Sequence, residues 1–108
     1  MDELTPGQAG TLRRFITSGF RFVTFERYAR YIAVEKSGFV ALLDPSGGKL
    51  ALFSQAGYLI DDGIGMLVDR PEGQAFVWHS QSVPATEELV TAYTQFKRKV
   101  QELLNPPC

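Results

Sequence analysis

Apolar residues recur along this chain with two different periods, and each period predicts one kind of secondary structure. Near the C-terminal end they repeat every three or four positions, which is typical of one face of a helix. This stripe consists of Leu89, Tyr93, Phe96, Val100 and Leu103. We expect the helix to hold Pro84 in its first turn and to stop at Asn105, which precedes two prolines.

The N-terminal pattern predicts a shorter helix, over about residues 6–18. Thr5, Pro6 and Gln8 match a capping box with proline at the first helical position. One face of this helix is apolar and consists of Leu12, Phe15 and Ile16. Gly19 is suited to end the helix, because glycine readily adopts the left-handed conformation found there.

The middle of the chain reads as short strands separated by turns. YIAVE and FVALLD flank KSG as one hairpin, and IGMLVD and AFVWHS flank RPEGQ as another. KLALFS and a short YLI lie between the two hairpins. Parallel strands need a crossover of about a dozen residues, and these links are much shorter. We therefore expect an antiparallel meander of five to seven short strands.

Residues 20–36 fit two interpretations. As a strand, FRFVTFE is rich in aromatic and β-branched residues, and its period of two places Arg21, Val23 and Phe25 on one face. As a helix, the stretch would align an apolar stripe of Phe22, Phe25, Tyr28, Ala29 and Ile32. We favour strands over 20–26 and 31–36 with a bulge or irregular join. The stretch holds no Gly, Pro, Asn or Asp, so we expect no tight turn in it.

These patterns predict one α+β domain over residues 1–108. An N-terminal helix would flank the antiparallel meander, and the C-terminal amphipathic helix would cover it. The alternative is a curved, barrel-like sheet whose open end the last helix plugs. A composition of 44% hydrophobic and 21% charged residues is that of an ordinary folded domain.

Charge and aromatic residues gather in one segment. Residues 13–31 hold five of the seven arginines, six aromatic residues and a single acid, Glu26, for a formal charge of +4. Such a mixture suits a nucleic-acid surface, on which bases stack and phosphates meet arginine. It equally suits a core element with arginines at its rim. The glycines of the RRM signature are absent, and we favour the core element.

Candidate chemistry elsewhere is sparse. His79 is the only histidine and could act as a base, but no second histidine or nearby cysteine joins it. Asp61, Asp62 and Asp69 do not match an EF-hand loop, and Asp-Asp-Gly is foremost a turn sequence. We therefore assign no catalytic, cofactor-binding or metal-binding residue, and we expect no cofactor. The only cysteine is Cys108, and no signal peptide or membrane-spanning run is seen, so we expect a cytoplasmic protein.

The function predicted is that of a non-catalytic binding or assembly domain that acts through protein–protein contact and associates with itself. Its expected binding residues are the exposed members of Arg21, Arg27, Tyr28, Arg30 and Tyr31. One alternative is a nucleic-acid binder that adds Arg13 and Arg14 to this set. Another is a small ligand-binding or enzyme subunit centred on His79. Exposure of the six aromatic residues between Phe15 and Tyr31 is the observation that bears most on this choice.

Overall fold

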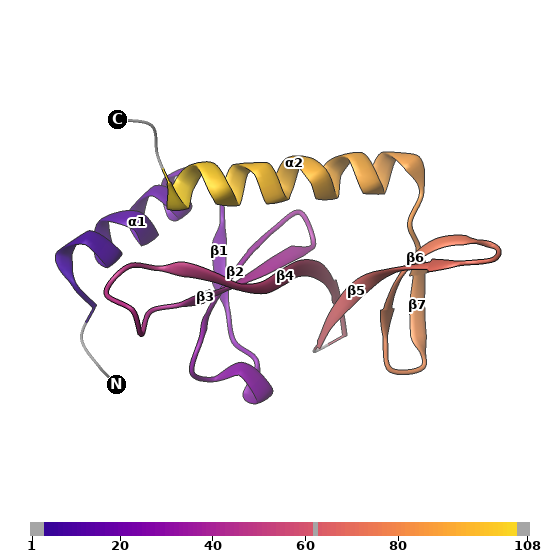
Figure 1. Ribbon diagram of the computed structural model, residues 1–108, viewed down its shortest axis with the longest axis horizontal. Coiled ribbons are helices and arrows are strands. Elements are labelled where there is room, and N and C mark those ends of the chain that lie inside the picture. The colour runs from indigo at the N-terminus through magenta and orange to yellow at the C-terminus, as the bar shows by residue number, and fades with distance from the viewer. Residues whose placement is uncertain (1–3, 62, 106–108) are drawn as a thin grey trace.

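Two helices lie on one side of an antiparallel sheet in the computed structural model, which describes residues 4–61 and 63–105 (Figure 1). The elements are α1 (Pro6–Thr17), β1 (Arg21–Val23), the 3₁₀ helix η1 (Glu26–Tyr28), β2 (Ile32–Lys36), β3 (Phe39–Asp44), β4 (Ala51–Ile60), β5 (Gly63–Arg70), β6 (Gly73–Trp78), β7 (Gln81–Pro84) and α2 (Glu87–Leu104). The seven strands pair in chain order, each antiparallel to the next. The predicted α+β meander is confirmed.

The start of α1 follows the sequence signature closely. The Gln8 amide N–H donates to the Thr5 hydroxyl over 3.1 Å, and the Thr5 amide N–H donates to Gln8 Oε1 over 2.9 Å. The Gln8 side chain also donates to the Pro45 carbonyl over 2.7 Å, which ties α1 to the turn after β3. Gly19 has a φ of 91°, so the predicted left-handed residue after this helix is confirmed.

The C-terminal helix begins later than predicted. Thr86 caps α2 by accepting a hydrogen bond from the Leu89 amide N–H over 3.2 Å. Pro84 belongs instead to β7, where it lies opposite Ala75. A proline fits there because β7 is an edge strand, so one side of it needs no hydrogen-bond donors. In the described part of the chain, neither helix is long and apolar enough to cross a membrane.

The stretch over residues 20–36 contains a turn that the sequence argument did not expect. Strand pairing covers only Arg21–Val23, and η1 follows at Glu26–Tyr28. The Tyr28 amide N–H donates to the Phe25 carbonyl and the Tyr31 amide N–H to the Tyr28 carbonyl, each over 3.0 Å. A 3₁₀ turn keeps φ negative, so it needs none of the usual turn residues. Strand character before and after an irregular join is confirmed, with a shorter first strand.

One strand replaces the two that were expected between the hairpins. The last four residues of KLALFS and all of YLI fall within β4, whose register against β3 shifts between Val40 and Leu42. Gly57 lies opposite Val40 and Phe53 opposite Leu42, so residues 54–56 form a bulge against a single β3 residue. Such a bulge bends the strand and increases its twist.

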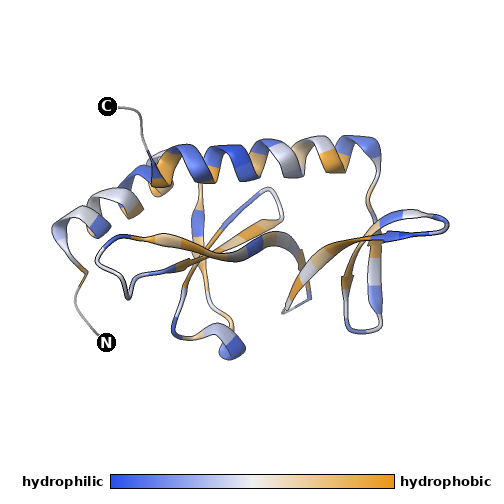
Figure 2. Ribbon diagram, viewed as in Figure 1, coloured by the Kyte–Doolittle hydropathy of each residue, from blue (hydrophilic) through white to orange (hydrophobic). Residues whose placement is uncertain are grey.

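Each face of the sheet carries its own apolar cluster. Residues of β2 and β3 alternate between them, because successive strand side chains point to opposite faces. The larger cluster lies under the helices; its best-buried members are Phe15, Phe39, Phe76, Leu43, Val34 and Val100. The second lies on the opposite face and comprises Phe25, Ala33, Val40, Leu42 and Ile64. Figure 2 shows the matching pattern on α2, hydrophobic toward the sheet and hydrophilic outward.

The sheet does not close, so the barrel alternative is wrong. β1 and β7 are its two edges, and β1 has only three residues with which to pair. The first residues of β5 pair with β4 and its later residues with β6, so the sheet divides into two parts at this strand. Rather than plugging an end, α2 lies along the long dimension of the molecule over both parts (Figure 1).

Candidate binding site

The link between β1 and β2 carries four of the five residues expected to bind. These are Arg27, Tyr28, Arg30 and Tyr31. Phe25 anchors the link in the second apolar cluster, and Tyr28 and Tyr31 pack half-buried against that cluster. The arginines next to these tyrosines stay exposed. The link therefore covers part of the sheet face opposite the helices and presents its charges outward.

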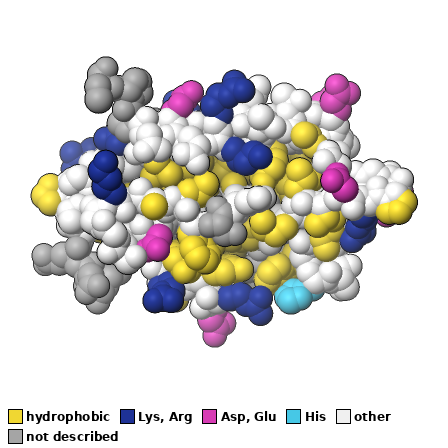
Figure 3. All heavy atoms as spheres, in the orientation of Figure 1, with side chains coloured by type: hydrophobic (Ala, Val, Ile, Leu, Met, Phe, Trp, Pro, Cys, Tyr) yellow, Lys and Arg dark blue, Asp and Glu magenta, His cyan; other side chains and the backbone are white. Residues whose placement is uncertain are grey.

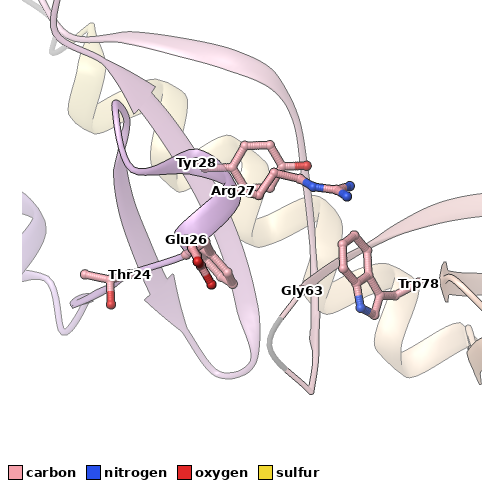
Figure 4. A pocket seen from close by; sticks show the side chains of 7 residues that line it. Thr24, Glu26, Arg27, Tyr28, Gly63 and Trp78 are labelled. Atoms are coloured by element: carbon pink, nitrogen blue, oxygen red, sulfur yellow. The ribbon is translucent and has the colours of Figure 1, made fainter.

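A cleft of about 410 Å³ opens beside this link, and we call it the Arg27–Trp78 cleft. Residues 24–28 line one side of it, and Gly63 of β5 and Trp78 of β6 line the other (Figure 4). The Arg27 guanidinium carbon lies 5.7 Å from the centroid of the Trp78 ring, within the range of a cation–π contact. The cleft thus combines aromatic walls with polar side chains that include one positive charge, Arg27, and one negative charge, Glu26.

Gly63 explains why Trp78 lies where it does. A Cβ atom on Gly63 would come within 2.0–2.4 Å of the indole ring, so no larger residue fits without moving it. Both residues lie just beyond the paired part of the β5–β6 hairpin, which begins with Met66 opposite Val77. An aromatic ring packed over a strand glycine protects the exposed backbone there.

A second aromatic group lies at the other end of the link. The Tyr31 ring stacks on Phe53 of β4 with 4.1 Å between centroids, and the Arg30 guanidinium carbon lies 5.9 Å from the Tyr31 ring. Asp44 is close enough for its charge to interact with that of Arg30. Hydrogen bonds from Ser46 chiefly lower the pKa of Asp44, and the positive charge of Arg30 lowers it further.

Arg21 lies apart from these groups and has a structural partner. Its guanidinium pairs with Glu35, the residue directly opposite on β2. Glu35 is only 7% exposed and also accepts a hydrogen bond from the Gly38 amide N–H over 2.8 Å. Removing a buried carboxylate from water is costly unless such partners satisfy it. Arg21 therefore stabilises the pairing of β1 with β2, and the structure does not bring it together with Arg27 and Arg30.

The six aromatic residues divide between core and surface. Phe15, Phe20 and Phe25 are buried, at 0%, 4% and 8% exposure, and Phe22 is 48% exposed. The other two, Tyr28 and Tyr31, are half-buried. Most of the segment is therefore scaffold, and its outer rim is the part available for contact.

The two N-terminal arginines lie on α1, on the helical side of the sheet. Arg14 donates a hydrogen bond to the Leu103 carbonyl over 3.1 Å, at the C-terminal end of α2. A cation is favourable there because the last helix carbonyls carry partial negative charge. Arg13 is exposed on the same helix. The arginines between residues 13 and 31 are thus distributed over both sides of the sheet.

His79 is exposed and is not one of the residues that line the cleft. Its φ is 54°, and its ring packs edge-on against Trp78 with 4.1 Å between centroids. Asp61 accepts a hydrogen bond from Gln81, and Asp69 accepts one from Gln74 over 3.0 Å. Asp62 lies outside the described residues. Within the described ranges, no three His, Cys, Asp or Glu side chains gather as a metal site would need.

Three residues of this surface were not predicted from the sequence: Trp78, Gly63 and Phe53. Trp78 and Phe53 fell inside expected strands, and Gly63 fell in an expected turn. Their roles arise from pairing between segments far apart in the chain, as with Tyr31 and Phe53. The sequence offered one signal of this contact. One strand of the second hairpin begins with glycine, and the other ends near a tryptophan.

Comparisons with protein-family models, with curated proteins and with solved structures gave no match for this chain.

Proposed function

We propose that this chain is a non-catalytic cytoplasmic domain that acts through protein–protein contact and associates with itself. The observation that carries the proposal is the arrangement around the β1–β2 link, where exposed arginines lie against half-buried aromatic rings. Arginine and aromatic residues are enriched at protein interfaces because they offer large apolar contact together with directed hydrogen bonds.

The mixture of charges on this surface favours a protein over a nucleic acid. Glu26 lines the same cleft as Arg27, and Asp44 lies near Arg30. A polyphosphate would meet these acids wherever it met the arginines, whereas a protein can present both signs of charge. Figure 3 is consistent with such contact, since hydrophobic side chains gather across the middle of the face shown and Lys and Arg side chains lie around them.

The two alternatives have less support. Arg14 and Arg21, which a nucleic-acid surface would need, are engaged with Leu103 and Glu35. An active site centred on His79 would need a pocket around that residue, and the cleft is lined by its neighbour Trp78 instead.

Sedimentation velocity over a range of protein concentrations tests the proposal together with heparin chromatography. We expect the sedimentation coefficient to rise with concentration and the protein to pass through heparin at low salt. A chain that stays monomeric and is retained on heparin with a steep salt dependence would contradict the proposal and support the nucleic-acid alternative.

A further inference from the structure

The Arg27–Trp78 cleft has the size and lining of a site for part of a peptide. Its volume of about 410 Å³ lies within the range of about 300–1,000 Å³ found for ligand pockets. Phe25, Tyr28 and Trp78 give it apolar walls, and Phe25 is itself buried in the second apolar cluster. The walls come from the anchored link and from a paired strand, so the cleft is held open without a ligand.

Arg27 gives the cleft a preference for a carboxylate. Figure 4 shows Arg27 and Tyr28 extending from η1 in the same direction, toward Trp78. A guanidinium attracted to an aromatic face still has its N–H donors free at its edge, where a carboxylate can accept two of them. The 5.7 Å contact with Trp78 holds the guanidinium in place, so less side-chain freedom is lost on binding.

Glu26 sets the class of ligand. Its side chain points away from Arg27 and Trp78 in Figure 4, yet it lines the same cleft. Glu26 repels any anion in this cleft, a ligand carboxylate as well as a phosphate. A peptide also carries amide N–H groups that can donate hydrogen bonds to Glu26, whereas the phosphates of a nucleic acid have no such donors. The combination therefore suits a chain that bears a carboxylate and also offers N–H donors.

We propose that the Arg27–Trp78 cleft binds an acidic peptide segment of a partner protein, with a ligand carboxylate on Arg27 and the neighbouring bulky apolar side chain against Phe25, Tyr28 and Trp78. This inference rests on the proposed function and deepens it, because it names the class of partner. Charge complementarity with Arg27 and apolar complementarity with the walls are the two features that such a segment must provide.

Trp78 is the only tryptophan in the chain, so fluorescence excited beyond the absorption band of the four tyrosines reports on this cleft. The probes are capped peptides in which glutamate flanks phenylalanine or leucine, and matched peptides with glutamine in place of glutamate. We expect a saturable change in Trp78 fluorescence, with the glutamate peptides bound about tenfold more tightly, as loss of a charge-assisted hydrogen bond implies. An oligonucleotide of equal negative charge should bind more weakly than the glutamate peptides.

The variant Arg27→Ala should lower the affinity for the glutamate peptides about tenfold while leaving the glutamine peptides unaffected. Arg98→Ala, which removes an exposed arginine on α2, is the matched control and should change neither. Isothermal titration calorimetry measures the same affinities if a variant alters the fluorescence signal itself. Both arginines are exposed, so neither substitution is expected to prevent folding.

Equal binding of the glutamate and glutamine peptides, no saturable binding of either, or tighter binding of the oligonucleotide would each overturn the assignment. These titrations use neither sedimentation nor heparin. A cleft that binds no peptide in a chain that still self-associates would therefore overturn this inference alone, and a monomeric, heparin-binding chain would overturn the proposed function.

Discussion

At the scale of single residues, the contact between Gly63 and Trp78 is the most constrained feature of the candidate site. A methyl group on Gly63 would overlap the indole ring, whose nearest atom would lie 2.0 Å away. Trp78 also contacts Arg27 and His79, so a shift of the ring would disturb both. One glycine thus maintains the geometry of the cleft.

We expect Gly63→Ala to lower the free energy of unfolding by about 1–3 kcal/mol, as overpacking of a fitted contact does. Urea unfolding followed by Trp78 fluorescence measures this, and a shifted emission maximum of the folded state would report displacement of the ring. Gly47→Ala is the matched control, because no atom lies within 4 Å of its added methyl group. A Gly63→Ala variant as stable as Gly47→Ala would show that the ring moves aside freely.

At the scale of secondary-structure elements, the β1–β2 link is more than a connection. Its Phe25 completes an apolar cluster that β2, β3 and β5 leave open, and the same link positions Arg27 and Arg30. Phe22, three residues earlier on β1, is half-exposed. The anchoring of the link to the sheet therefore depends much more on Phe25 than on Phe22.

Phe25→Ala should destabilise the protein by about 3–5 kcal/mol, which is the cost of removing a buried phenylalanine. Phe22→Ala removes the same side chain from a half-exposed position, so we expect its cost to be clearly smaller. Thermal or urea unfolding measures both. Similar losses for the two variants would mean that the link is not anchored through Phe25. Destabilisation by Phe25→Ala should also weaken any ligand binding to the cleft.

The elements themselves could largely be predicted, because local patterns determine them. The Thr5–Gln8 capping box and the apolar stripe of α2 read directly as helices. Pro84 was misplaced since a proline suits an edge strand as well as a helix start. The cleft was not predictable, because the meeting of Arg27 with Trp78 depends on how two distant hairpins are placed.

At the scale of the whole molecule, the open sheet leaves two edges with different properties. β7 ends at Pro84, which lacks an N–H and so discourages further pairing at that position. β1 has no proline, and Phe22 in its middle is 48% exposed. The unpaired N–H and C=O groups of an edge strand can pair with another strand. If the chain associates with itself, β1 is the edge better suited to do so.

Two copies can pair their β1 strands antiparallel about a two-fold axis at Phe22, which would place the two Phe22 rings together and continue the sheet from one copy into the next. We expect Phe22→Lys to abolish concentration-dependent sedimentation, because a charge at the centre of an edge strand blocks pairing.

Val68→Lys is the matched control. It also replaces an exposed apolar side chain, 37% exposed, with a charge, but Val68 lies on β5 inside the sheet, so this variant should still self-associate. Wild-type-like association of the Phe22→Lys variant would place the contact elsewhere. A three-residue strand buries little area by itself, so the dimer should be weak and should dissociate on dilution.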